Sequence, residues 1–259
     1  MANIPIGIQL YTVRDQLAKE PKETLKAVAD IGYAGVEGGP PGGMDAQAFL
    51  ETLDDLGMTL IGGGCSSAEL RENIEGVAER SKALGVTRLM TGVGGELRRL
   101  NNDWKRVTEL LAEGCANAAE AGLEILYHNH AFELEGKVAV NGGETTGLDY
   151  MLENIPAEHM GAELDTYWIQ TGGYDPGAYI RKYAGRLPHL HIKDRAPAPD
   201  DAQCPFAEIG HGILDWDDIF ESAEKSGVEW LIVEQDRCVR PPIESARLSF
   251  EYLKSRGMV

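Results

Sequence analysis

One sequence pattern recurs along the chain: a helical stretch ends at a glycine, and a short apolar run follows it. Its copies place the glycine at Gly32, Gly57, Gly85, Gly122 and Gly227. A glycine just past a helix end readily adopts the left-handed backbone that closes the helix. The runs that follow do not alternate strictly between apolar and polar residues, as expected of strands buried on both faces. This pattern therefore predicts repeated units of helix and buried strand.

Three further strands are predicted over residues 6–10, 159–164 and 187–192, which brings the number of strands to eight. Helical patterns separate the strands, over residues 21–31, 46–56, 67–83, 102–121, 147–155, 176–183, 216–226 and 243–256. Alternating strands and helices imply a parallel sheet with right-handed crossovers, and eight such units in ~250 residues match a (β/α)8 barrel. We predict an α/β fold, a single TIM barrel that forms one domain over residues 1–259.

An open doubly wound sheet is the alternative architecture. Such a sheet normally carries a glycine-rich phosphate turn after its first strand. Here that position reads Gln9-Leu10-Tyr11-Thr12-Val13-Arg14, which disfavours the alternative. Residues 195–203 are rich in Ala, Pro and Asp, and we expect them to form a long loop after the seventh strand rather than a domain linker.

Charge and composition exclude several classes of protein. The 259 residues include 24 basic and 42 acidic ones, which gives a formal net charge of −18. A nucleic-acid partner is not expected, because phosphate contacts need clustered Lys and Arg. A membrane partner is not expected either, since there is no apolar stretch of spanning length and no targeting segment at the start. The four cysteines form no CxxC pair, so a reducing, cytoplasmic location is the expectation.

In a TIM barrel the active site lies at the carboxyl ends of the strands. Polar residues occupy that position after most of the predicted strands: Gln9, Tyr11 and Arg14; Glu37; Thr91; His128, Asn129, His130 and Glu133; Asp165 and Trp168; His189, His191, Lys193 and Asp194; Glu234 and Asp236. Four of the six histidines follow strands five and seven, and a fifth, His211, lies in the next loop. This clustering beside acidic residues favours a functional site over isolated structural histidines.

Imidazole and carboxylate groups together suit Mn²⁺, Co²⁺, Fe²⁺, Zn²⁺ or Mg²⁺. Carboxylates at a barrel mouth repel one another unless a cation or a proton joins them. Asp165, His191 and Glu234 therefore form a candidate site for one divalent ion. A fourth ligand is expected from strand five, with Glu133, His130 and His128 as the candidates. His189 and His191 share one face of a strand, and His191, nearer the mouth, is the better ligand.

Each of these residues also has a purely structural interpretation. Asp165 could cap a helix or a turn. Lys193 could be a solvated loop residue or could contact a substrate oxyanion. Trp168 and Tyr11 could stack on a sugar face or merely pack. Glu37 could equally be a site residue or an ordinary charged residue at a strand end. Glu234 has few structural explanations, because it follows an apolar strand and a buried carboxylate needs a partner.

Several segments together resemble the xylose-isomerase-like TIM-barrel superfamily of sugar phosphate isomerases and epimerases. They are Gly7-Ile8-Gln9-Leu10-Tyr11-Thr12-Val13-Arg14-Asp15, Tyr127-His128-Asn129-His130-Ala131-Phe132-Glu133, Glu163-Leu164-Asp165-Thr166-Tyr167-Trp168, Leu190-His191-Ile192-Lys193-Asp194, Gly210-His211-Gly212-Ile213-Leu214-Asp215-Trp216 and Val233-Glu234-Gln235-Asp236. The resemblance covers nearly the whole chain, and it is specific for the superfamily rather than for one substrate.

The resemblance implies a single divalent metal, commonly Mn²⁺, Co²⁺ or Mg²⁺, held by Glu, Asp, His and Glu from strands five to eight. The last three carry over to Asp165, His191 and Glu234. At strand five the chain departs from the pattern, because Tyr127-His128-Asn129-His130 stands where those epimerases have their Glu. The nearest carboxylate, Glu133, is the predicted ligand, with His128 and His130 around it. Dimers and tetramers are common in the superfamily, so a homo-oligomer is an expected state.

The predicted function is a metal-dependent isomerase or epimerase of a sugar or keto-sugar. Glu133 and Glu234 are the predicted acid and base, and Lys193 and His211 are candidate stabilisers or proton shuttles. The predicted substrate contacts are Tyr11, Arg14, Glu37, His128, His130 and Trp168. No Arg/Lys pair in the sequence marks a phosphate pocket, which slightly favours an unphosphorylated substrate. The same enolate chemistry would serve a 3-keto-glycoside lyase or an inosose-type dehydratase, and this is the main alternative. A metal-dependent endonuclease and a sugar-binding barrel without catalysis are weaker ones.

Overall fold

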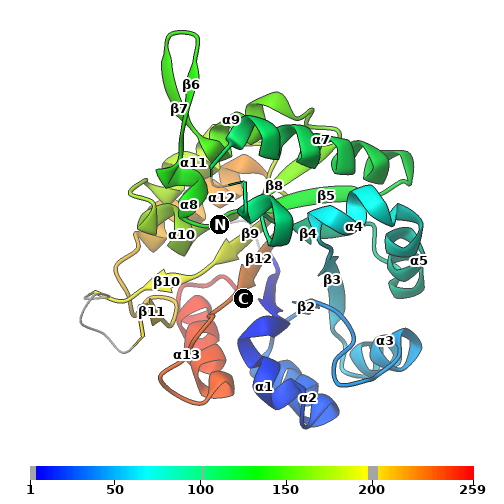
Figure 1. Cartoon of the computed structure of the whole chain (residues 1–259). Helices are drawn as coiled ribbons and strands as arrows, with labels where there is room; N and C mark the ends of the chain where they lie inside the picture. The colour runs from blue at the N-terminus through cyan, green and yellow to red at the C-terminus, as the bar shows by residue number, and fades with distance from the viewer. Residues whose placement is uncertain (1–3, 101, 198–203) are drawn as a thin grey trace.

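The computed structural model of the chain describes residues 4–100, 102–197 and 204–259. Within them, eight parallel strands close into a barrel in the order β1-β12-β9-β8-β5-β4-β3-β2 (Figure 1). The barrel strands are β1 (Ile6–Gln9), β2 (Gly35–Glu37), β3 (Thr59–Gly64), β4 (Arg88–Thr91), β5 (Glu124–His128), β8 (Met160–Asp165), β9 (His189–Ile192) and β12 (Trp230–Val233). The predicted α/β TIM barrel is confirmed.

Helices surround the barrel as an outer ring (Figure 1). They are α1 (Arg14–Leu17), α2 (Pro21–Ile31), α3 (Ala46–Asp55), α4 (Ser67–Glu72), α5 (Ile74–Leu84), α6 (Gly95–Arg98), α7 (Trp104–Glu120), α8 (Phe132–Glu135), α9 (Gly147–Asn154), α10 (Thr166–Thr171), α11 (Pro176–Lys182), α12 (Trp216–Ser226) and α13 (Pro242–Ser255), with the 3-10 turn η1 (Leu10–Val13) after β1. None of the helices in the described part of the chain combines the length and hydropathy that a bilayer span requires.

The recurring glycines end helices as predicted. Gly32, Gly85 and Gly227 are themselves the capping residues of α2, α5 and α12, with φ of 118°, 66° and 78°. Gly57 and Gly122 directly follow the caps of α3 and α7 and also have positive φ. The chain turns from the outer ring back into the barrel at each of these positions. Glycine is used there because a side chain would be strained in this conformation.

The interior of the barrel changes from apolar to polar along its axis. At the amino-terminal end, Trp230 and Ile61 fill the space beside Gly7 and Gly35: a Cβ on Gly7 would lie 2.2 Å from Ile61 Cδ1, and one on Gly35 would lie 3.1 Å from Trp230 Cη2. Two residues further along the same strands, the inward positions are Gln9, Glu37 and their polar neighbours. The amino-terminal end of the barrel is therefore a packed apolar layer, and the polar inward residues lie at the carboxyl ends of the strands.

The structure differs from the sequence prediction in a few local features. The helix predicted over residues 67–83 is two helices, because Asn73 has an extended φ of −150°, and its side chain caps α5 by accepting from Gly76 N. A hairpin of β6 (Lys137–Val140) and β7 (Gly143–Thr146) was not predicted and projects away from the barrel (Figure 1). The loop predicted over residues 195–203 begins with β10 (Asp194–Arg195), which pairs with β11 (Phe206–Ala207); residues 198–203 lie outside the described ones.

Candidate active site

Strand β9 and the residue after it supply three inward side chains. His189, His191 and Lys193 alternate with outward residues, so all three point into the barrel at successive depths. The backbone at Lys193 is held on both sides by Thr166, whose hydroxyl accepts from Lys193 N and donates to Lys193 O, both at 2.9 Å. The predicted order of depth is confirmed, with His191 nearer the mouth than His189.

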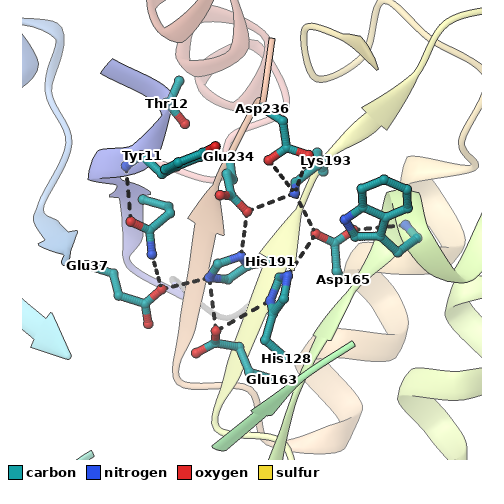
Figure 2. A network of polar contacts seen from close by, with 12 residues as sticks. Tyr11, Thr12, Glu37, His128, Glu163, Asp165, His191, Lys193, Glu234 and Asp236 are labelled. Atoms are coloured by element: carbon teal, nitrogen blue, oxygen red, sulfur yellow. Dashed lines mark hydrogen bonds and ion pairs between the residues drawn. The ribbon is translucent and has the colours of Figure 1, made fainter. Parts of the chain in front are cut away.

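The ring of His191 lies between three carboxylates (Figure 2). Its Nε2 is 2.8 Å from Glu37 Oε2 and 3.1 Å from Glu163 Oε1, and its Nδ1 is 3.0 Å from Glu234 Oε2. Both nitrogens face acceptors, so both donate when the ring is an imidazolium. Burial alone would lower the pKa of His191, but Glu163 and Glu37 outweigh it and raise the pKa well above its usual value.

Glu37 and Glu163 form the deeper half of the network. His189 Nδ1 lies 3.3 Å from Glu163 Oε2, and Gln9 Nε2 donates to Glu37 Oε2 at 2.7 Å. Burial and the Glu37 charge raise the pKa of Glu163 to about 7. Burial works in the same direction on Glu37, but His191 and His189 lower the pKa of that carboxyl below its ordinary value. The deep layer is therefore an ion-pair network that anchors His191 from below.

Lys193 occupies the upper half of the network among three carboxylates, of which Glu234 is shared with His191 (Figure 2). Its Nζ lies 2.8 Å from Glu234 Oε2, 3.0 Å from Asp165 Oδ2 and 3.3 Å from Asp236 Oδ1. Burial would lower its pKa, yet Asp165 and Glu234 raise it above the ordinary lysine value. The same contact holds down the pKa of Glu234, with His191 adding to the effect against burial. Lys193 is thus a buried ammonium group paired with an ionised Glu234, and it is not a solvated loop residue.

Asp165 has both a structural and a site role. Its Oδ1 accepts from Trp168 N and caps α10, while its Oδ2 faces Lys193 and lies 3.8 Å from His128 Nε2. Its backbone N–H donates to Asn129 Oδ1 from β5's following loop, which ties the two strand ends together. Burial raises the pKa of Asp165 to about 6, although Lys193 opposes this. The two interpretations of this residue are therefore compatible.

A cavity of about 660 Å³ opens above the network. Its lining comes from most of the strand ends and comprises Tyr11, Arg14, Met90, Gly92, Val93, Gly94, His128, His130, Lys193, Glu234, Asp236 and Arg237. Burial lowers the pKa of His130 to about 4, with Lys193 adding to the effect, and burial together with His191 holds the pKa of His128 well below its usual value. The cavity therefore presents neutral imidazoles beside the charged Glu234–Lys193 pair.

The structure places Glu133 outside this group. Its carboxylate accepts from Tyr127 Oη and from His130 N, both at 2.8 Å, and burial raises its pKa to about 7. His128, one of the alternatives that the residue pattern left open, lies in one cluster with Asp165, His191 and Glu234. Trp168 lies beside the network rather than on the cavity wall, with its ring centroid 5.2 Å from that of His130. Glu37 is in the deep layer and does not line the cavity.

His211 is exposed in its loop and does not line the cavity. The motif around it instead surrounds a buried carboxylate, that of Asp194. Asp194 accepts from the backbone N–H groups of Gly210, Gly212 and Leu214 and from Trp216 Nε1, at 2.8–3.3 Å. A Cβ on Gly212 would lie 2.2 Å from Asp194 Oδ1, which explains the second glycine. The motif thus holds the segment after Lys193 in position. None of the residues 210–216 lines the cavity.

The residues present fit a divalent cation. Among the described residues, one ligand atom each from His128, Asp165, His191 and Glu234 lies within 4.8 Å of the others, and a second group joins Glu37, Glu163 and His191. Three buried atoms here, His128 Nδ1, Glu163 Oε1 and Asp165 Oδ2, have no hydrogen bond, although the two oxygens have ion-pair contacts with His191 and Lys193. Two imidazoles and two carboxylates are a donor set that suits Mn²⁺, Fe²⁺, Co²⁺ or Zn²⁺. The mouth-side group is the better candidate, since two of its four members, His128 and Glu234, line the cavity and none of the deeper group does.

We expect the purified protein to bind about one equivalent of a divalent metal at this group. Asp165→Ala and His191→Ala should each lose it, because a three-ligand remnant beside Lys193 binds weakly. Elemental analysis of the three proteins after incubation with Mn²⁺ is the measurement. Glu133→Ala is the matched control and should keep the metal; loss of metal in Glu133→Ala alone would restore Glu133 as the ligand.

Four residues of the site were given no role from the sequence: Gln9, Glu163, Asp236 and Arg237, although the first three stand at predicted strand ends. Glu163 and Asp236 each stand two positions from a predicted ligand, Asp165 and Glu234. Because side chains of a strand alternate between faces, this spacing was the signal that could have found them. Gln9 lies two residues before Tyr11 and accepts from its N–H at 3.1 Å, so it helps to shape the turn after β1 that carries Tyr11.

Comparison with known proteins agrees with this fold. The family model described as xylose isomerase-like TIM barrel matches residues 25–256. The chain belongs to this family. Among curated relatives, it is 26% identical over 170 residues to an inosose dehydratase from Lacticaseibacillus casei, a match that covers 59% of this chain and 54% of that protein. The chain thus matches about half the length of that relative. A second inosose dehydratase, from Geobacillus thermodenitrificans, is 23% identical over 90% of this chain and 88% of its own length.

Solved structures of family members share the barrel at low sequence identity. A sugar phosphate isomerase/epimerase from Parabacteroides distasonis has a TM-score of 0.81 and 22% identity, over 98% of this chain and 99% of its own. An L-ribulose 3-epimerase has a TM-score of 0.68 and 18% identity, over 96% and 93%. At these identities the likeness establishes the fold that the xylose isomerase-like family shares.

Proposed function

We propose that this protein is a lyase that removes a β-substituent, water or an alcohol, from a keto-sugar or a related polyhydroxy ketone. The observation that carries the proposal is the contact between Lys193 Nζ and Glu234 Oε2, 2.8 Å apart on one wall of the cavity. An ionised carboxylate and an ammonium group side by side can act on the same face of a substrate, one as base and one as acid. An elimination on one face can use such a pair, with proton removal and protonation of the leaving oxygen on the same side.

The steps follow from the protonation states. Glu234 takes the proton from the carbon next to the substrate carbonyl, and the electron pair of that C–H bond forms the enolate. As the enolate collapses to a carbon–carbon double bond, the bond from the β-carbon to its oxygen breaks. Lys193 donates its proton to the departing oxygen, so the products are an unsaturated ketone and water or an alcohol. Proton transfer to Glu234 removes one of the charges that raise the pKa of Lys193, which makes the ammonium group a better acid at the moment it is needed.

Two further residues prepare this pair. His191 Nδ1 lies 3.0 Å from Glu234 Oε2, and as an imidazolium it donates to that oxygen and helps to keep the carboxylate ionised. His128 borders the same wall as a neutral imidazole that can accept a hydrogen bond from a substrate hydroxyl. A divalent cation held by His128, Asp165, His191 and Glu234 would polarise the carbonyl and stabilise negative charge on its oxygen. The chain's own groups remain responsible for moving the protons.

Epimerisation or isomerisation is the second candidate, and a specific observation favours it. The neutral rings of His128 and His130 line the cavity together with Glu234, so a second proton acceptor and donor is present. The pair of glutamates expected from the resemblance is not assembled, because Glu133 is bonded to Tyr127 and His130. The named inosose dehydratases support elimination, and the L-ribulose 3-epimerase structure supports the second candidate.

Substitution of Lys193 should separate elimination from proton abstraction. In Lys193→Gln, the side chain still donates hydrogen bonds to the carboxylates but supplies no acidic proton. We expect elimination to fall at least ~10²-fold more than exchange of the α-hydrogen for solvent deuterium. Both rates come from one NMR time course in D2O with an inosose and a panel of ketoses as substrates. Circular dichroism checks the fold, because unpaired buried carboxylates destabilise a protein.

The product of the wild-type reaction decides between the two candidates. An unsaturated ketone with release of water or alcohol supports the lyase. Deuterium incorporation with only an epimer or isomer as product would replace it with the second candidate. Absence of both exchange and product across the panel, with metal bound, would leave a sugar-binding barrel and contradict the proposal. Glu221→Gln on the exposed face of α12 is the control and should behave as wild type.

A further inference from the structure

Two arginines stand at the mouth of the cavity on the same side. Arg14 begins α1, which follows β1, and Arg237 follows β12; β1 and β12 are neighbours in the barrel. Arg14 Nη2 donates to the carbonyl oxygen of Asp236 at 2.9 Å, and Asp236 is bonded directly to Arg237 in the chain. Two residues that are far apart in the sequence are therefore joined at one edge of the opening, which a sequence search for an Arg/Lys pair does not detect.

The guanidinium of Arg14 is held in a fixed orientation. Its Nη1 donates to Tyr11 O at 2.7 Å, its Nη2 donates to Asp236 O, and its Cζ lies 3.9 Å from the centre of the Tyr11 ring. These contacts use two of the five N–H donors of the group. A guanidinium held in this way loses little conformational entropy when it binds a further acceptor. The Arg14 guanidinium is therefore already oriented before a ligand binds.

Within the part of the chain that the structure describes, these two arginines have no carboxylate partner. Lys193 differs in this respect, because it is bonded to three carboxylates at the bottom of the same cavity. The cavity thus has two arginines without ion pairs at its opening and paired charges at its bottom. In a chain of net charge −18, such a pair at a ligand opening needs an explanation.

We propose that Arg14 and Arg237 bind an anionic oxygen group, a carboxylate or a phosphate, on the substrate. This inference rests on the proposed function and adds a substrate class to it. The carbonyl end of the substrate lies at Glu234 and Lys193, and the anionic end lies at the rim, away from the carboxylates that would repel it. A cavity of about 660 Å³ accommodates a monosaccharide with such a substituent. A carboxylate here would agree with the expectation of an unphosphorylated substrate, and a phosphate would overturn it.

Binding of matched sugars tests the proposal without any turnover. The ligands are glucose, glucuronate and glucose 6-phosphate, and the measurement is isothermal titration calorimetry on wild type and on Arg237→Gln. Arg237 is exposed, so its substitution leaves the buried network intact. We expect at least one of the two anions to bind wild type ~10-fold or more tightly than glucose, and Arg237→Gln to lose most of that preference. The anion that is preferred identifies the group as a carboxylate or a phosphate.

Arg247→Gln on α13 is the matched control, because it removes the same charge from an exposed site outside the cavity. Equal weakening in Arg237→Gln and Arg247→Gln would show a general charge effect and overturn the proposal. No preference of wild type for either anion would overturn it as well. Because no catalysis is measured, either of these results leaves the elimination proposal standing, and loss of elimination does not affect the binding result.

Discussion

Glu234→Gln should lower turnover by ~10³-fold or more and should abolish exchange of the substrate's α-hydrogen with solvent. Glu234 is the carboxylate on the cavity wall whose pKa is held low by Lys193 and His191 against the effect of burial, so it is ionised and able to accept a proton. The amide of Gln keeps the size of the side chain and an oxygen that accepts from His191, but it has no useful basicity. Both elimination and epimerisation begin with this proton transfer, so the prediction holds for either candidate.

The measurement is the rate of deuterium incorporation in D2O, together with product formation, for wild type and variant at equal metal content. Glu133→Gln is the informative comparison, because Glu133 was the other predicted acid/base residue. The structure places that carboxylate on Tyr127 and His130 instead, so its substitution should reduce turnover far less. Undiminished exchange in Glu234→Gln, or an equal loss in Glu133→Gln, would contradict the assignment of the base.

The barrel was predictable because its signals are local. A glycine after each helix and an apolar run of strand length reflect backbone geometry and burial, and both can be read within ten residues. The mouth residues followed from the fold, since parallel strands in a closed barrel bring their carboxyl ends together. Asp165, His191 and Glu234 were found for that reason, and one ligand atom from each lies in the same group of the structure.

The remaining features depend on loop geometry and on contacts between distant residues. Glu133 stands in the first turn of α8, and the turn from β5 directs its carboxylate back to His130 N and Tyr127 Oη, which no periodicity indicates. The deep pairing of Glu37 with His191 joins residues 154 positions apart. The Gly210–Trp216 motif drew attention to its histidine, whereas its backbone N–H groups and its indole serve Asp194.

Asp194→Ala should destabilise the protein by about 3–5 kcal/mol, because removal of a buried partner leaves several donors unsatisfied. Asp194 is fully buried, and its two oxygens accept from Arg195 N, Gly210 N, Gly212 N, Leu214 N and Trp216 Nε1. In the described part of the chain, Asp194 is the acceptor for all four donors of the 210–216 segment. We expect the melting temperature to fall on the order of 10 °C, measured by calorimetry or by urea unfolding.

Asp194→Asn makes the cause of that loss testable. Asn has the shape of Asp, but its NH2 group would face N–H donors where Oδ1 or Oδ2 now accepts, so we expect a loss close to that of the alanine variant. Asp54→Ala and Asp54→Asn, on the exposed side of α3, are the matched controls and should change stability by less than ~0.5 kcal/mol. Wild-type stability in Asp194→Asn would show that shape alone suffices there. The expected result would instead make the motif a ring of donors around one carboxylate, which holds the chain immediately after Lys193 and so fixes the acid of the proposed reaction.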